Sequence, residues 1–175
     1  MNKIFEVIEA KNIFNMKIDK FKILVHPKSY VHAVVHFKSG ITKFLAHETT
    51  MEIPIMNSLY GNNTNYYNNK EFKYSKLNGL NFINPNLKNF PLLKILNYKK
   101  SNTFFEVILV SLNDALVKLY LENRINFISL HYMLLKLLKN PYFTKHYDLS
   151  PKNINEIKNM VRKVNKFLKV YLNIE

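Results

Sequence analysis

Apolar and polar positions in the first 50 residues predict a helix followed by a small sheet. Residues 2–14 (NKIFEVIEAKNIF) carry apolar side chains at helical spacing, and Asn2 suits the N-cap. Three apolar runs predict strands: 21–26 (FKILVH), 31–37 (VHAVVHF) and 41–46 (ITKFLA). Turn residues at 38–40 (KSG) make the last two runs a hairpin, and the alternation in 31–37 predicts a sheet with one buried face.

The middle of the chain has a weaker pattern. Residues 51–60 (MEIPIMNSLY) predict a short helix entered through Pro54. Residues 61–70 (GNNTNYYNNK) contain almost no aliphatic side chain, which is typical of a solvent-exposed loop or linker. Residues 76–91 (KLNGLNFINPNLKNFP) predict an extended segment rich in turns.

From about residue 90 onward the pattern becomes helical and predicts a small antiparallel bundle. The expected helices cover 103–123, about 127–139, and the last segment, where Ser150 caps and Pro151 occupies the first helical position. Apolar residues of the last helix recur every three or four positions: Ile154, Ile157, Val161, Val164, Leu168 and Tyr171. The fold class predicted for the whole chain is therefore α+β.

Composition excludes several classes of protein. The chain has 175 residues, no Cys and three Gly, so it carries no disulfide scaffold, no cysteine metal cluster and no thiol nucleophile. It contains neither of the two common glycine-rich phosphate loops. No apolar run approaches the length of a membrane-spanning helix, and the first residues do not resemble a signal peptide. These features predict a protein of the cytoplasm or an equivalent reducing compartment.

The net charge of +14 has two explanations. A basic protein can bind nucleic acid. Here nearly all the basic residues are Lys, Arg occurs only at 124 and 162, and the Lys residues are scattered along the chain. Phosphate readers commonly use the bidentate Arg side chain. Compositional drift is therefore the favoured explanation, and a surface for polyanions is the alternative.

Few residues suggest chemistry by themselves. Glu6 and Glu9 lie three residues apart on one helical face and could bind a divalent cation, although such pairs are usually a solvated face. His26 and His32 flank a short loop, where histidines are more often structural than catalytic. Asn113 and Asp114 suggest a buried polar contact or a surface pair.

An ordered set of short motifs resembles the 1-deoxy-D-xylulose 5-phosphate reductoisomerase family. The motifs span 2–10 (NKIFEVIEA), 23–32 (ILVHPKSYVH), 51–55 (MEIPI), 76–94, 113–114 (ND) and 124–127 (RINF). Each motif is weak alone, but their order covers almost the whole chain. The resemblance implies an NADPH- and metal-dependent oxidoreductase and isomerase of isoprenoid biosynthesis, acting on a sugar phosphate in the cytoplasm or a plastid-like organelle.

The resemblance also assigns roles to residues. Asn2, Lys3 and Glu6 would bind substrate, and Glu6 would be one of three carboxylate ligands of Mg²⁺ or Mn²⁺. His32 would support the active site, whereas Glu9 and His26 would be supporting or structural. Ile4 occupies the place of a family Gly, where its bulk could obstruct the substrate.

The resemblance covers only the later part of that enzyme. It implies the end of the catalytic and metal-binding domain at 1–60, a linker and extended segment at 61–89, and a helical bundle domain at 90–175. NADPH would be bound by an N-terminal domain that this sequence does not contain, so the chain is expected not to catalyse alone.

Three hypotheses follow from this. The chain pairs with a separately encoded N-terminal half and forms a homodimer as family members do, or it is a non-catalytic remnant, or it is a basic nucleic-acid-binding module.

Overall fold

The computed structural model describes residues 1–61, 73–98 and 102–172. These residues form two compact units. The first contains Met1–Lys22 together with Asn86–Glu175, and the second contains Ile23–Pro85. The first unit is helical, whereas the second holds the described strands, so the α+β class is confirmed. The domain boundaries at 1–60, 61–89 and 90–175 concern roles in a longer enzyme and stay a prediction.

Helix α1 (Asn2–Ile13) opens the first unit, as the periodicity predicts. Its Asn2 is not the N-cap, so that prediction is wrong. Met1 is the capping residue, because its carbonyl oxygen already accepts the N–H groups of Ile4 and Phe5, at 2.8 and 3.2 Å. Ile4 is only 1% exposed and belongs to the hydrophobic core of the first unit. One face of α1 is therefore anchored in that core.

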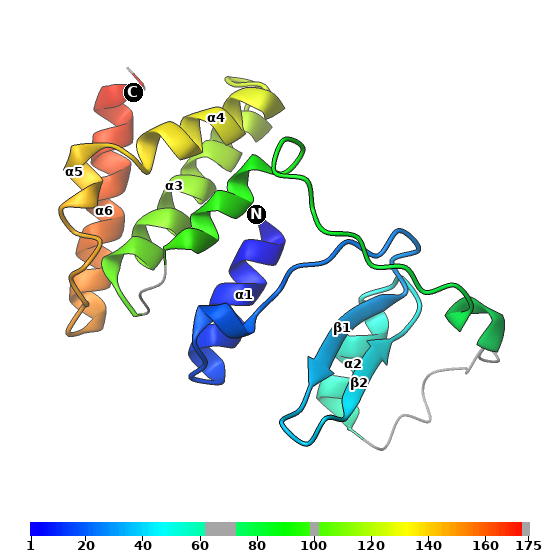
Figure 1. Ribbon diagram of the computed structural model, residues 1–175. Helices are drawn as coiled ribbons and strands as arrows, with labels where there is room; N and C mark the ends of the chain where they lie inside the picture. The colour runs from blue at the N-terminus through cyan, green and yellow to red at the C-terminus, as the bar shows by residue number, and fades with distance from the viewer. Residues whose placement is uncertain (62–72, 99–101, 173–175) are drawn as a thin grey trace. The chain divides into compact units, whose positions relative to one another are not determined.

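Helix α3 (Phe104–Leu121) is the centre of this core (Figure 1). Helices α4 (Phe127–Leu137) and α6 (Ile154–Tyr171) both pack against it. Because two helices cover it, α3 buries side chains around most of its circumference, and four of its core residues are completely buried: Ile108, Leu109, Leu112 and Leu116. The 3-10 helix η3 (Pro91–Asn97) precedes α3, and the short helix α5 (Pro141–Thr144) follows α4.

The last helix begins later than predicted. Asn153, not Ser150, is its N-cap, and the Asn153 side chain accepts the Glu156 N–H at 3.0 Å. The Glu156 side chain in turn accepts the Lys152 N–H at 2.9 Å, so the two side chains provide acceptors for two backbone N–H groups at the start of the helix. The buried stripe of α6 consists of Met160, Val164 and Leu168. Ile154 at its start is exposed, because the core does not extend that far.

The second unit contains a two-stranded antiparallel hairpin. Strands β1 (Val31–His36) and β2 (Thr42–Ala46) pair as predicted. Gly40 closes the turn with φ of +86°, a conformation that glycine adopts without strain. Helix α2 (Glu52–Tyr60) follows, also as predicted, and Gly61 ends it with φ of +55°. Gly61 is the only residue of the predicted 61–70 loop that lies within the described residues.

Two strand predictions are wrong. Residues 21–26 form no strand, and Val25 makes only an isolated bridge with Ile83. Pro27 lacks an N–H and Ser29 has φ of +51°, so the backbone cannot continue the pairing. The hairpin also lacks the predicted buried face, because Val34 and Val35 point to opposite faces and both are exposed.

The 3-10 helix η2 (Tyr74–Leu77) begins the predicted extended and turn-rich segment. None of the helices in the described part of the chain is long and apolar enough to span a membrane.

Candidate functional site

The first turns of α1 present three predicted site residues to solvent. Asn2, Lys3 and Glu6 are all exposed, whereas Ile4 and Val7 between them in the sequence are buried. The Lys3 Nζ lies 2.5 Å from Glu6 Oε2, and the two side chains are 59% and 54% exposed. The arrangement brings an amide, an ammonium and a carboxylate together on one accessible face.

Ile4 does not crowd this face. Its side chain lies in the core of the bundle, on the side of α1 away from Lys3 and Glu6. The expectation that its bulk could obstruct a substrate is therefore wrong for the α1 surface. An apolar residue here is explained by packing, because it contributes to the contact between α1 and the bundle.

Glu6 has the chemistry of a hard-cation ligand, since carboxylate oxygens are preferred by Mg²⁺. Within residues 1–61, 73–98 and 102–172, no group of three His, Cys, Asp or Glu side chains could hold a metal ion. Glu9 is exposed on α1 as well. Glu6 could therefore be one ligand of a metal site that needs further ligands from other residues.

His32 lies on β1 in the second unit, half-buried beside His47. The His32 Nε2 is 3.1 Å from His47 Nδ1, and the ring centroids are 3.6 Å apart. His47 Nδ1 also lies 2.6 Å from the Glu48 carbonyl oxygen. His47 Nδ1 thus lies within hydrogen-bond distance of both the His32 ring and the Glu48 carbonyl oxygen. Motif reading missed His47, which follows the residue of β2 paired with Val31.

The predicted site residues are thus distributed over both compact units. Asn2, Lys3 and Glu6 share one face of the first unit, and His32 belongs to the second. His26 also belongs to the second unit. Its Nδ1 lies 3.0 Å from the Asn81 carbonyl oxygen, and its ring centroid lies 5.3 Å from that of Phe82. These contacts fit the structural role expected of His26.

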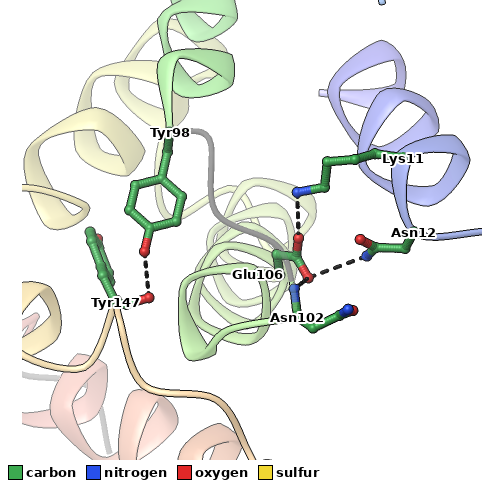
Figure 2. Close-up of polar contacts among 6 residues, drawn as sticks. All are labelled: Lys11, Asn12, Tyr98, Asn102, Glu106 and Tyr147. Atoms are coloured by element: carbon green, nitrogen blue, oxygen red, sulfur yellow. Dashed lines mark hydrogen bonds and ion pairs between the residues drawn. The ribbon is translucent and has the colours of Figure 1, made fainter. Parts of the chain in front are cut away.

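An ion pair that the sequence did not indicate connects α1 to α3 (Figure 2). The Lys11 Nζ lies 2.8 Å from Glu106 Oε1, and the two side chains are 3% and 15% exposed. The other carboxylate oxygen, Oε2, accepts from Asn12 Nδ2 at 3.3 Å and from the Asn102 N–H at 3.2 Å. One carboxylate therefore contacts two successive residues of α1 and the segment before α3.

Two half-buried tyrosines form a second polar cluster in the first unit, also drawn in Figure 2. The Tyr98 hydroxyl donates to the Tyr147 carbonyl oxygen and lies 3.0 Å from Asp148 Oδ1. The rings of Tyr98 and Tyr147 both pack on Phe105, with centroids 4.0 and 4.8 Å from it. Burial raises the pKa of Tyr98, and nearby Asp148 adds to the rise. Burial raises the pKa of Tyr147 also.

Asn113 is buried in α3, whereas Asp114 beside it is exposed. The Asn113 Nδ2 lies 3.5 Å from Asp114 Oδ1. The Asn113 Oδ1 has no hydrogen-bond partner among the described residues. Of the two interpretations left open for this pair, the buried polar contact applies to Asn113.

Relatives of the chain are reductoisomerases. It is 45% identical to the 1-deoxy-D-xylulose 5-phosphate reductoisomerase of Pelagibacter ubique over 161 residues, which is 91% of this chain and 42% of that protein. It is 37% identical to the Wolbachia pipientis enzyme of the same name, over 74% of this chain and 34% of that one. The chain thus spans well under half the length of these relatives.

Solved structures agree on the fold. A DOX-P reductoisomerase in complex with NADPH, fosmidomycin and magnesium superposes with a TM-score of 0.81 at 21% identity, covering 99% of this chain and 44% of that one. The reductoisomerase of Zymomonas mobilis in complex with NADPH gives 0.73 at 22% identity, covering 94% and 43%. Residues 47–167 match the family model described as DXP reductoisomerase C-terminal domain. That match includes more than half of the chain, which therefore belongs to the DXP reductoisomerase C-terminal domain family.

Proposed function

We propose that this chain is the C-terminal portion of a 1-deoxy-D-xylulose 5-phosphate reductoisomerase. It acts on a sugar phosphate together with a separately encoded N-terminal portion that binds NADPH. The observation that carries the proposal is the exposed group of Asn2, Lys3 and Glu6 on α1, in a chain whose family is that of the reductoisomerases.

Each of the three side chains has a definite part. The Lys3 ammonium binds the substrate phosphate or hydroxyl oxygens, and the Asn2 amide hydrogen-bonds the hydroxyl oxygens. The Glu6 carboxylate is one ligand of Mg²⁺ or Mn²⁺. In the complete enzyme a bound cation would polarise the substrate oxygens, and NADPH would supply the hydride. Lys3 holds the Glu6 carboxylate in place on the helix surface before a cation binds.

His32 has a supporting part. Its Nε2 lies 3.1 Å from His47 Nδ1, which also contacts the Glu48 carbonyl oxygen. This pairing orients the His32 ring within the second unit, and the family resemblance gives that ring a supporting role at the active site. His32 is accordingly a positioning residue in this proposal.

Supply of the missing portion tests the proposal. The part of the Pelagibacter ubique relative that this chain does not span provides a partner, because the two proteins are 45% identical over the shared part. The mixture is assayed for NADPH oxidation that depends on 1-deoxy-D-xylulose 5-phosphate and Mg²⁺. We expect activity from the mixture and none from either portion alone.

The Glu6→Gln variant is the matched test of the site, because it keeps the size of the side chain and removes the charge. It should abolish the metal-dependent activity of the mixture. Lys118→Met, on the exposed part of α3, is the control and should leave it unchanged. A mixture that associates yet oxidises no NADPH means that the chain is a non-catalytic remnant. Light scattering on the same mixture tests the homodimer that we also propose.

A further inference from the structure

We infer that the Lys11–Glu106 ion pair is a positioning device that sets the orientation of α1, and with it the placement of Asn2, Lys3 and Glu6. The inference rests on the function proposed above for those three residues. Neither Lys11 nor Glu106 contacts substrate in this scheme. Both act through the helix.

Because the ion pair lies among mostly apolar side chains, it depends on the rotational position of α1. Lys11 and Glu106 line a narrow recess together with one tyrosine and five apolar side chains: Tyr98, Ile8, Ile18, Ile95, Leu96 and Phe105. A charge in such surroundings requires an opposite charge and hydrogen bonds. Apolar contacts such as those of Ile4 are not directional and tolerate small rotations. The ion pair does not tolerate such a rotation, because rotation of α1 would leave a buried ammonium group without its carboxylate.

The pair also restricts α1 at more than one point. Glu106 Oε1 contacts Lys11, while Oε2 contacts Asn12 on α1 and the backbone of Asn102. Asn102 has φ of +57°, which turns its N–H toward the carboxylate ahead of α3. Both oxygens of one side chain therefore hold successive residues of the same helix. This fixes its rotation about its own axis as well as its distance from α3.

Helix geometry transmits this constraint to the candidate site. Glu6 precedes Lys11 by five residues, which is about 7.5 Å along the axis, and it points to the opposite side of α1. A side-chain tip lies roughly 5–6 Å from that axis, so a rotation of about 20° moves it by roughly 2 Å. A misplacement of about 1 Å at a reacting centre can cost on the order of a hundredfold in rate. The pair therefore controls catalytic geometry from a distance.

Spin-label distances test the orientation without any enzymatic assay. The chain has no Cys, so labels attach only at introduced sites. We choose Ile13→Cys at the exposed end of α1 and Lys169→Cys on the exposed face of α6. The distance distribution is recorded for the labelled chain and after adding Lys11→Met, Glu106→Gln, Lys11→Arg or, as the control, Lys118→Met.

We expect one narrow distribution in the parent and in Lys118→Met. Lys11→Met and Glu106→Gln should increase the width of the distance distribution at least twofold in chains that remain folded. Lys11→Arg keeps the positive charge and should keep the distribution nearly as narrow as in the parent. Should Lys11→Met fail to fold, Glu106→Gln decides, because its amide keeps the shape of the carboxylate. A parent-like distribution in the folded variants would overturn the inference and leave the pair a stabilising contact only.

Activity of the mixture with the Pelagibacter portion gives a second readout. Lys11→Met and Glu106→Gln should lower kcat at least tenfold and change the substrate KM less than threefold. Unchanged kcat in both would also overturn the inference. An inactive parent mixture contradicts the proposed function instead, and the spin-label distances still decide whether the pair orients α1.

Discussion

Lys3 and Glu6, one turn apart on α1, form an ion pair on the surface of the helix, with the ammonium nitrogen 2.5 Å from a carboxylate oxygen. Exposed pairs of this kind stabilise a fold very little, because water screens them and both side chains lose freedom. The contact therefore does not explain why both residues are charged. The function proposed for them, contact with a substrate and a metal ion, does explain it.

The first prediction separates stability from activity at this pair. Lys3→Met and Glu6→Gln should each change the free energy of unfolding by less than about 0.5 kcal/mol, measured by urea denaturation. The same variants should lose nearly all activity in the mixture with the N-terminal portion. A large loss of stability would instead make the pair structural.

The second prediction concerns the energetic weight of the buried pair. Lys11→Met leaves the Glu106 carboxylate buried without its ammonium partner and should lower the free energy of unfolding by about 3–5 kcal/mol. Lys118→Met removes an exposed pair of the same bundle, 3.8 Å long, and should cost less than about 0.5 kcal/mol. Urea unfolding of the whole chain measures both. Equal effects would contradict the burial of Lys11.

The third prediction follows from two histidines in the first unit. Burial lowers the pKa of His131 and of His146 below the usual 6.5, and for His146 the nearby Lys145 and Lys163 add to the effect. The folded chain thus binds these protons less tightly than the unfolded chain. Stability should be unaffected well above pH 6.5 and should fall as the pH drops below that value.

Imidazole NMR signals measure this directly. Both residues should titrate with midpoints below 6.5, and a variant with His131→Gln and His146→Gln should lose part of the acid sensitivity of unfolding. Midpoints above 6.5 would contradict the prediction.

The fourth prediction addresses Asn113, whose buried Oδ1 has no partner in the described part of the chain. An unsatisfied buried acceptor costs free energy that an apolar side chain of similar size does not. Asn113→Leu should therefore leave the free energy of unfolding unchanged or raise it by up to about 1 kcal/mol. Thermal unfolding measures the change. A marked loss of stability would mean that the amide has a partner in the folded protein.

Sequence reasoning located the longer helices α1, α3, α4 and α6, because apolar residues recur at helical spacing along them, but it missed the four-residue α5. It failed where the outcome depends on distant residues. The strand expected at 21–26 finds only Ile83 as a partner, and no local pattern reveals that. Lys11 was not suspected, because a Lys is normally exposed and its partner Glu106 lies 95 residues further on.

In the candidate site, too, some residues are found from the sequence and others only from the structure. Asn2, Lys3 and Glu6 came from a family motif, and their exposure on one helical face agrees with helical spacing. His47 carries no motif, and its contact with His32 becomes visible only through the register of β1 and β2. Contacts set by the register of paired strands are difficult to read from one sequence.

The position of α1 in the core has a consequence for synthesis. Its apolar face is covered by η3 and α3, which the ribosome makes some 80–100 residues later. At bacterial and eukaryotic elongation rates that interval lasts roughly 4–20 s. During that time Ile4 lacks its partners in η3 and α3, and only the 3-10 helix Ile18–Lys20 directly after α1 is available to contact the helix. Assembly of the first unit must therefore wait until α3 has been made, however early α1 becomes helical.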